Sequence, residues 1–480
     1  MNSWIRPQLM DMAIQSLLRD EAFALRARKE LPVKLFPTVF TVAFRGGHRK
    51  VLSAMVQAWP LPQLHLGPLL VDPKSYQDSL WAILDSLDVV SRPGKGGKSK
   101  LKVIGFRPDV ELIQSSDSSE EAASSLYSDA THVEPEVTLP ETRSRQRRHW
   151  KKRPCQAWQP LDLYINLSLG TSHSGNVSSS VLRKVRRSCR PLRLFCRKLH
   201  IKDMPVIRTM EILNLLQLEF IQELEICGCS GLPSGDNKFA RQVEHMKNLC
   251  SFTLAHLIFG TSAAESQLPS HAFISFLSHL SRLGHLRMLH PSSYHISGHL
   301  YCLLSYLPAA LETLELPCYT LLHRDICCLS QSPQASHLKK LDLSKNDLSQ
   351  IARGALEALV RETSDTLQEL VLDHCGIRDL HLMVLLPAPS CCFHLHSLSF
   401  SGNWISSYSL ENLLQLVAKL AELKVVVCPY PIECHEYMER MRLCSIESQQ
   451  FISVTTMVHN MLKASGRENL KWIFTLNTFL

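Results

Sequence analysis

A short motif of spaced apolar residues constrains this chain more than any other feature of its sequence. Its clearest copy, residues 338–348, reads Leu-Lys-Lys-Leu-Asp-Leu-Ser-Lys-Asn-Asp-Leu. The same spacing, with Cys or Asn at the ninth position, returns at residues 367–377 and 395–405. Weaker copies begin at Cys196, Ile221, Leu249, Leu283, Leu311 and Leu420. The first and last of these nine starts lie 224 residues apart, an average step of 28 residues, which is typical of a structural repeat.

The physical meaning of the motif follows from its spacing. Apolar residues at the first, fourth and sixth positions predict a short strand that points them into a core. A polar or thiol side chain at the ninth, such as Asn346 or Asn403, should be buried in the turn. The rest of each unit, as in residues 356–360 and 410–416, has helical spacing. We therefore predict an α/β leucine-rich-repeat solenoid, a horseshoe with a parallel concave sheet and convex helices.

The N-terminal part of the chain has a different pattern. Apolar residues recur at helical spacing through most of the first 90 residues, which predicts a helical cap. Two segments near this cap, residues 61–69 and 101–109, also fit the repeat template. The expected divisions are a helical cap at 1–100, an early repeat strand at 101–109, a flexible linker at 110–160, the horseshoe at 161–430 and a C-terminal cap at 431–480.

The linker prediction depends on charge. Residues 109–141 contain nine acidic residues and no Lys or Arg, so they cannot bury enough apolar surface to order themselves. The next segment, 143–153, has seven basic residues in eleven. It fits a solvated run and a nuclear import signal equally well. The candidate import residues are Arg147, Arg148, Lys151, Lys152 and Arg153.

Composition limits the class of protein. The chain has 480 residues, of which 45% are hydrophobic and 20% charged, and this excludes global disorder. Its formal charge of +8 is too small to indicate nucleic-acid binding by itself. Asp11, Arg19 and Asp20 interrupt the N-terminal segment where a signal peptide needs an apolar run, and no stretch is long enough to span a membrane. With sixteen cysteines, some of them adjacent, we expect reduced thiols in a cytoplasmic and nuclear protein.

Motifs for chemistry are weak. Residues 92–99 nearly form a phosphate-binding loop, but Arg92 stands where its first Gly is required. Cys391, Cys392, His394 and His396 lack a second Cys/His pair at zinc-finger spacing. We therefore expect no enzyme activity, no metal, no cofactor and no small-molecule substrate.

Eight short segments recur in a fixed order along nearly the whole chain. They are QSLLRDEA at 15–22, LPVKLFP at 31–37, AMVQAWP at 54–60, LDSLDV at 84–89, LSQSP at 329–333, TLQELV at 366–371, DHCGI at 373–377 and YPIE at 430–433. Through these segments the chain resembles the PRAME family (preferentially expressed antigen of melanoma), most of all its rodent PRAME-like and oogenesin-like branch.

The resemblance implies a function and partners. It implies a substrate-recognition adaptor of a cullin-type ubiquitin ligase, with an N-terminal helix that binds elongin C and an adjacent segment that binds the type two cullin. It also implies roles in repressing transcription, in proliferation, and in blocking differentiation or apoptosis. The candidate elongin-binding residues are Leu17, Leu18, Ala22 and Leu25, and the candidate cullin-binding residues are Leu31 and Pro32. The same helix equally fits a cap whose leucines are buried internally.

The concave face is the expected binding surface for a protein substrate. Its charges should alternate in sign along the arc, whereas a nucleic-acid backbone needs a continuous positive track. A germ-cell or embryonic interaction scaffold or transcriptional co-repressor without a ligase is the alternative. The candidate concave residues are Lys198, His200, Glu223, Glu225, Arg287, Glu315, Lys340, Asp342 and Asp373.

Overall fold

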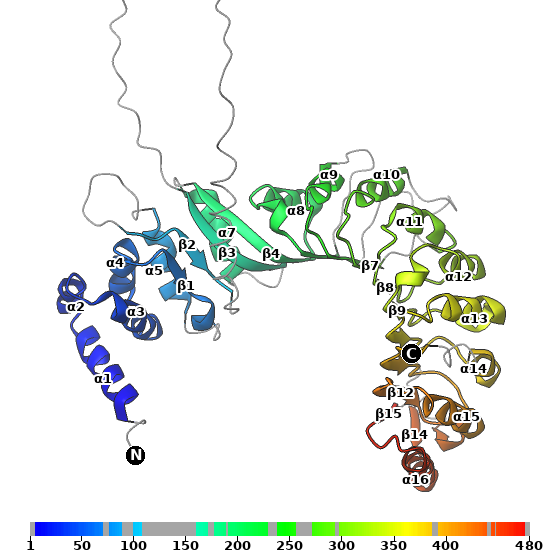
Figure 1. The fold of residues 1–480 in the computed structure, drawn as a ribbon. Coiled ribbons are helices and arrows are strands. Elements are labelled where there is room, and N and C mark those ends of the chain that lie inside the picture. Colours follow the sequence, from blue (N-terminus) through cyan, green and yellow to red (C-terminus); the bar gives the residue numbers. More distant parts are fainter. Residues whose placement is uncertain are drawn as a thin grey trace, which may run out of the picture. The chain divides into compact units, whose positions relative to one another are not determined.

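The chain divides into two compact units, which Figure 1 shows in a computed structural model. One unit contains residues 1–166 and 174–195, and the other contains 167–173 and 196–480. The linker and the basic run expected at 110–160 lie almost wholly outside the described residues. The structure describes residues 5–70, 76–88, 99–107, 160–170, 177–188, 191–228, 238–255, 271–292, 297–385, 392–438, 443–446 and 448–475.

The N-terminal unit is built on helices, as the apolar spacing predicts. Phe36 and Phe40 of one helix pack edge-on against Trp59, with ring centroids 5.8 and 5.2 Å apart. The Trp59 indole in turn donates to the Gln63 carbonyl at 2.8 Å. The helices are α1 (Ile5–Arg19), α2 (Glu21–Ala27), α3 (Phe36–Arg45), α4 (Arg49–Gln57), α5 (Gln77–Ser86) and α7 (Val177–Arg187), with short 3₁₀ turns η1 (Val33–Leu35) and η2 (Gly67–Leu69).

Strands accompany these helices. Both early template segments are strands, β1 (Gln63–His65) and β2 (Val103–Gly105), which pair in parallel. Next to β2 lies β3 (Leu161–Gly170), which the repeat template missed because its apolar residues alternate strictly instead of following the motif. All thirteen strands β1 to β12 and β15 follow one another in order in a single sheet.

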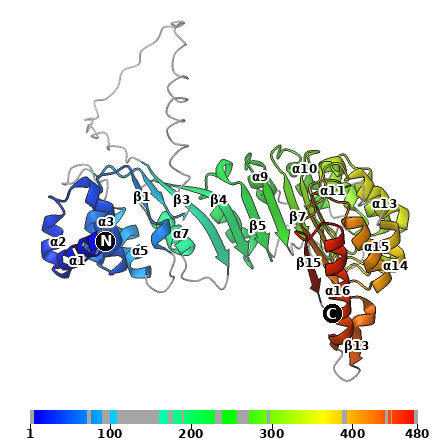
Figure 2. The same ribbon diagram turned by 60° about the horizontal axis from the view of Figure 1, so that its bottom comes forward.

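The repeat unit confirms the predicted solenoid. Its strands pair in parallel and its helices lie on their outer side (Figure 2). The nine strands predicted between residues 196 and 428 are β4 (Leu192–Lys202), β5 (Glu223–Cys227), β6 (Ser251–Ala255), β7 (Met288–Ser292), β8 (Thr313–Glu315), β9 (Lys340–Asp342), β10 (Glu369–Val371), β11 (Ser397–Ser399) and β12 (Val425–Pro429).

Each return segment carries a helix. These are α8 (Val206–Leu213), α9 (Lys238–Glu244), α10 (His271–Leu280), α11 (Leu300–Tyr306), α12 (His323–Ser330), α13 (Arg353–Glu362), α14 (Asp379–Leu385) and α15 (Ser407–Val417). Short 3₁₀ turns are η4 (Leu218–Phe220), η6 (Ala335–His337), η7 (Leu348–Gln350) and η9 (Ile432–Cys434). No helix among the described residues is long and apolar enough to cross a membrane.

The ninth position of the motif closes the turn as predicted. Asn346 is fully buried, and its side-chain oxygen accepts from the Tyr319 and Leu321 amides at 2.9 and 3.2 Å. Its NH₂ group donates to the Leu316 and Leu343 carbonyls, both at 2.8 Å. Asn403 repeats these contacts two coils further on. The side-chain amide thus satisfies backbone groups of two coils at once.

Two predicted repeat starts are wrong by three residues. The copy assigned to Leu283 begins at Leu286, because the buried strand residue is Leu289 and Met288 is 44% exposed. The copy assigned to Leu420 likewise begins at Leu423, where Val426 pairs with Leu398. An apolar residue also lies three positions before each true start, buried where the helix turns into the strand, so spacing alone could not decide the register.

The C-terminal part closes the last repeat. Helix α16 (Ser448–Ala464) leads to β15 (Lys471–Thr475), which pairs in parallel with β12. Between them, the buried Arg467 guanidinium donates to the Leu420 and Leu423 carbonyls at 2.6 Å each. The strands β13 (His435–Met438) and β14 (Leu443–Ile446) form a separate antiparallel pair.

Candidate interaction surfaces

The candidate elongin-binding residues lie on α1 and α2 but do not share one exposed face. Leu18 is only 2% exposed and belongs to the cap's own core. Leu17 and Leu25 are half-buried, and Ala22 is exposed at the start of α2. Asp20 fixes the break between the helices, because its carboxylate accepts from the Phe23 amide at 3.0 Å.

A second set of apolar residues on these helices faces solvent, and the sequence reasoning missed it. Leu9, Met12 and Phe23 are 60, 64 and 56% exposed. Leu9 and Met12 lie three residues apart on α1, opposite the buried pair Ile14 and Leu18. Helix α1 therefore has two apolar faces, and the second could have been found as a separate stripe at helical spacing.

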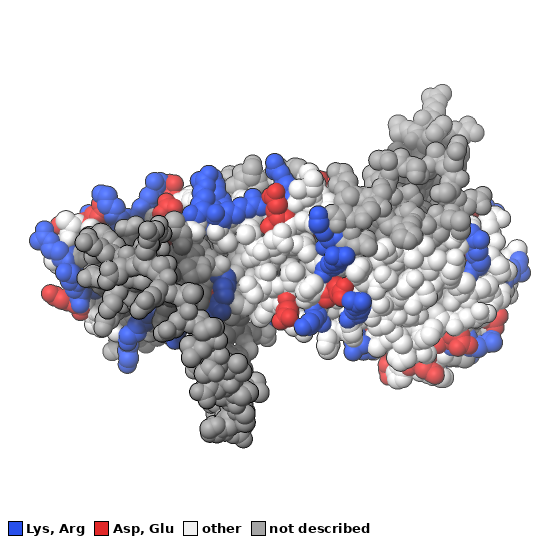
Figure 3. Space-filling model, turned by 90° about the horizontal axis from the view of Figure 1, so that it is seen from above, with Lys and Arg blue, Asp and Glu red and all other residues white. Residues whose placement is uncertain are grey.

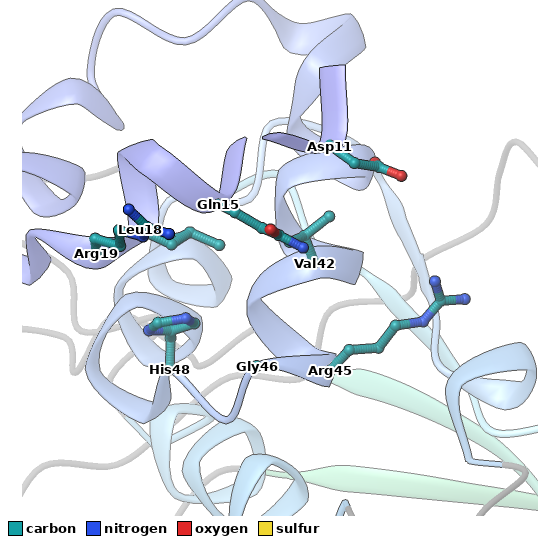
Figure 4. A pocket seen from close by; sticks show the side chains of 8 residues that line it. All are labelled: Asp11, Gln15, Leu18, Arg19, Val42, Arg45, Gly46 and His48. Atoms are coloured by element: carbon teal, nitrogen blue, oxygen red, sulfur yellow. The ribbon is translucent and has the colours of Figure 1, made fainter. Parts of the chain in front are cut away.

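A pocket of about 430 Å³ lies between α1 and α3 (Figure 4). In this view the Gln15 side chain reaches toward Val42, while Arg45 extends from the end of α3. The lining residues are Asp11, Gln15, Leu18, Arg19, Val42, Arg45, Gly46 and His48. Most of them are charged or polar, so the pocket suits a polar group better than an apolar anchor.

The candidate cullin-binding residues follow α2. Leu31 is half-buried, whereas Pro32 is exposed and precedes η1. The neighbouring Val33 is 50% exposed. Upstream, the Arg28 guanidinium donates to the Ala54 carbonyl of α4 and holds the end of α2 in place.

Basic side chains characterise the N-terminal unit on the face that Figure 3 shows. Residues 5–70 contain nine Lys or Arg and four Asp or Glu. Two basic residues of α7 have partners within the unit. Lys184 is buried and lies 2.6 Å from the Asp88 carboxylate, and the Arg183 guanidinium lies 4.3 Å from the centre of the Trp81 ring.

The concave face of the repeat unit carries ion pairs between neighbouring strands. Lys198 of β4 lies opposite Glu223 of β5, with 2.9 Å between ammonium and carboxylate. Further along, the Glu315 carboxylate lies 2.9 Å from His290 and 2.7 Å from Lys340. The hydrogen bond from His290, and then Lys340, lowers the pKa of Glu315 to about 2, although burial opposes the shift. Several of the alternating charges thus pair across neighbouring strands.

Three of the candidate concave residues have local roles. Arg287 precedes β7 because of the register correction, and its guanidinium donates to the Ala310 carbonyl at 2.9 Å. The concave position that the sequence assigned to Arg287 is occupied by His290 instead. Asp373 accepts from the Ser399 hydroxyl at 2.6 Å, and Asp342 accepts from the Ser344 amide at 2.8 Å.

The Cys/His segment that invited a zinc interpretation is divided between core and surface. Cys392 is buried, and its thiol donates to the Val360 carbonyl at 3.9 Å. His394 and His396 instead lie 3.3 and 3.5 Å from the Glu422 carboxylate. Cys391 and the glycine-rich residues 92–98 lie outside the described residues.

Comparison with known proteins gives matches along nearly the whole chain. The model of the PRAME N-terminal domain matches residues 6–111, and that of the PRAME C-terminal domain matches residues 161–473. PRAME family member 8 of Homo sapiens is 33% identical over 436 residues, which cover 90% of this chain and 87% of that protein. Leucine-rich repeat-containing protein 14 of Homo sapiens is 30% identical over 494 residues, which cover 97% of this chain and 96% of that protein.

Among solved structures, the leucine-rich repeat-containing protein LegL7 from Legionella pneumophila matches with a TM-score of 0.38 and 15% identity. The match covers 65% of this chain and 90% of that one. An internalin (inlF) from Listeria monocytogenes matches with a TM-score of 0.30 and 13% identity, over 55% of this chain and 73% of that one.

Proposed function

This chain belongs to the PRAME family, and from that membership we propose that it is the substrate-recognition adaptor of a cullin-type ubiquitin ligase. In this proposal α1 and α2 bind elongin C, the segment at Leu31 and Pro32 contacts the type two cullin, and the repeat unit holds a protein substrate. Regulation of transcription, proliferation, differentiation and apoptosis, in the cytoplasm and the nucleus, would follow from the choice of substrate.

The observation that carries the proposal is the outward apolar face of the N-terminal helices. Leu9, Met12 and Phe23 are each more than half exposed, although the same helices bury Ile14 and Leu18 in the cap. Leaving three large apolar side chains in water gains nothing for the fold, and such surfaces commonly mark contacts with other proteins. An amphipathic helix presented to an apolar groove is a recurrent way to make such a contact.

The burial of each candidate residue supports a narrower version of the proposed elongin contact. Leu17, Ala22 and Leu25 are accessible at least in part, so they can contribute without a change in the cap. Leu18 contributes only if α1 leaves its place, because its side chain is enclosed by the cap. We therefore expect the contact to combine Leu17, Ala22 and Leu25 with the exposed residues Leu9, Met12 and Phe23.

The repeat unit supports a protein substrate. Its concave positions are polar and their charges are paired across strands, as with Lys198 and Glu223. A partner that approaches this face meets alternating donors and acceptors, which suits the mixed surface of another protein. A nucleic-acid backbone would meet both signs of charge and gain little.

Co-purification with elongin C tests the proposal. Wild-type chain co-expressed with elongin C should form a stable complex. Ala22→Arg places a long charged side chain in the proposed contact, and losing one well-packed anchor typically costs about 2 kcal/mol, roughly thirtyfold in affinity. The matched control is Thr38→Arg, which adds the same side chain at an exposed position of α3. Both variants should melt within about 2 °C of wild type, because neither position is buried.

Two outcomes would overturn the proposal. If the wild-type chain does not capture elongin C, the alternative of an interaction scaffold or co-repressor without a ligase is favoured. If the Thr38 and Ala22 variants bind equally well, elongin C contacts another surface. A pull-down with residues 31–480, which lack α1 and α2, locates the contact: binding should be lost if these two helices make it, and retained if elongin C contacts another surface.

A further inference from the structure

We propose that His200, Glu225 and Cys227 form a zinc-binding site on the concave face of the repeat unit. His200 lies on β4 and the other two residues on β5, where His200 and Glu225 are direct neighbours in the parallel register. The imidazole, carboxylate and thiol ligand atoms all lie within 4.8 Å of one another. Within the described part of the chain, this is the group of His, Cys, Asp and Glu side chains that comes close enough to hold a metal ion.

The spacing of the ligand atoms fits a tetrahedral metal ion. The His200 Nε2 lies 3.4 Å from the Glu225 Oε1, and the Cys227 Sγ lies 3.5 Å from the same oxygen. Zinc binds nitrogen and oxygen at about 2.0 Å and sulfur at about 2.3 Å, so tetrahedral ligand atoms are about 3.3 Å (N to O) and 3.5 Å (O to S) apart. Two of the three edges of the site therefore have the required length already.

The chemistry of the three ligands selects the metal. Thiolate, imidazole and carboxylate together match the ligand preferences of zinc. Calcium and magnesium require mainly oxygen ligands, and Cu(I) prefers sulfur over carboxylate. On binding, the Cys227 thiol loses its proton to the solvent, so thiolate, carboxylate and Zn²⁺ add to zero charge. The nearby Lys198 ammonium is engaged with Glu223 at 2.9 Å, which limits its repulsion of the cation.

Three protein ligands leave a tetrahedral zinc ion with one open position. His200 and Glu225 keep 42 and 47% of their side-chain surface exposed, so the ion would be accessible from the concave face. A His, Cys or carboxylate side chain of a bound partner can occupy the fourth position. The site would thus make recognition by the repeat unit dependent on zinc, and it would do so whether or not the chain serves a ligase.

Cobalt titration of the full-length chain tests the site. Co²⁺ has no strong absorption in water, but thiolate ligation adds a near-ultraviolet charge-transfer band and tetrahedral ligation intensifies its visible bands. We expect one equivalent of Co²⁺ to produce the charge-transfer band and the intense visible bands, and one equivalent of Zn²⁺ to abolish them by displacing the cobalt. Cys227→Ser should abolish the charge-transfer band. Removing a residue that only hydrogen-bonds to a metal ligand typically lowers metal affinity roughly 10- to 100-fold. His200→Ala and Glu225→Gln remove ligands themselves, so each should lower the zinc affinity by more than that.

The matched control is Cys250→Ser. Cys250 directly precedes β6, the next strand of the sheet, and its thiol donates to the Asn248 carbonyl at 3.3 Å. This variant should keep the bands and the affinity of wild type. Circular dichroism of all variants establishes whether the fold is retained.

A second measurement needs no variant. Zinc should protect Cys227 from alkylation by iodoacetamide while the exposed Cys318 reacts at the same rate with and without the metal. Mass spectrometry of the digested protein reports both. The proposal is overturned if Cys227 is alkylated equally with and without zinc, or if the cobalt bands persist in Cys227→Ser. In that case the three side chains form an ordinary hydrogen-bonded cluster.

Discussion

The repeat unit and the N-terminal cap use the same kinds of apolar side chain but differ in how firmly the sequence assigns them to the core. In the repeats, a leucine at a given position has equivalents in the coils before and after it, and Leu338, Leu341 and Leu343 are all at most 1% exposed. In the cap, Leu18 is buried while Leu9 on the same helix is 60% exposed. In the repeats, the equivalent positions of neighbouring coils show which side of a strand or helix faces the core. In a single helix with two apolar faces, the sequence does not show which face is buried.

This difference predicts that the turn asparagines are the most sensitive positions of the molecule. Asn346→Ala would leave the Tyr319 and Leu321 amides and the Leu316 carbonyl without the side chain that satisfies them. The Leu343 carbonyl would keep only its bond from the Cys375 thiol. Each unsatisfied buried group costs about 1–3 kcal/mol, so we expect a loss of roughly 4 kcal/mol or more in the free energy of unfolding.

Urea unfolding monitored by circular dichroism measures this loss. Gln350→Ala, at an exposed position of the same coil, is the control and should change stability by less than about 0.5 kcal/mol. If the two variants are equally stable, the hydrogen bonds of the Asn346 side chain do not explain why Asn occupies the ninth position.

Much of the fold could be predicted because nine copies of one motif constrain one another. The errors at Leu283 and Leu420 arose where an apolar residue three positions before the true start mimics the motif. Strand β3 was missed because Leu161 to Leu169 alternate with period two, a strand signal that the repeat template does not include. Strand β15 was not predicted because it forms by pairing with β12, and no pattern in its own sequence indicates that pairing.

The candidate sites were harder to predict because they depend on side chains brought together by stacking. His200 and Cys227 lie in different coils and have no metal-ligand spacing in the sequence; only superposing the coils places them on neighbouring strands. On α1, periodicity identified Leu18 as apolar but could not tell whether it faces the cap or solvent. That choice depends on where α3 packs, which is a tertiary contact.

The second prediction separates the two apolar faces of α1. Leu18→Ala should leave a cavity in the cap and lower the free energy of unfolding by about 2–5 kcal/mol. Leu9→Ala, on the outward face, should leave stability nearly unchanged. Thermal unfolding followed by circular dichroism compares them, and a Leu9 variant as unstable as the Leu18 variant would show that the outward face is covered within the protein.

The third prediction concerns the last repeat, where the Arg467 side chain donates to backbone carbonyl groups just before β12. Arg467→Met should remove the buried donor to the Leu423 carbonyl and one of the two donors to the Leu420 carbonyl, at a cost of about 2 kcal/mol. In this variant, hydrogen exchange should accelerate more at the β15 amides than at the amides of the central strands. Lys463→Met, at an exposed position of α16, is the control; if it accelerates exchange as much, Arg467 is not what holds the end of the unit.

The smallest expected effect is the pH dependence of the concave ladder. Hydrogen bonding by His290, followed by Lys340, lowers the pKa of Glu315 from 4.5 to about 2 in the folded chain. A carboxyl whose pKa is lower in the folded state stabilises the fold above pH 4.5 and loses that contribution as the pH falls toward 2. Because the group is partly exposed and screened by salt, we expect about 1 kcal/mol. Urea unfolding should therefore show wild type more stable than Glu315→Gln at pH 6 and equally stable near pH 2. The control is Glu362→Gln, on the exposed side of α13, which should be as stable as wild type at both pH values. A constant difference between wild type and Glu315→Gln across this range would mean that packing, not charge, makes Glu315 stabilising.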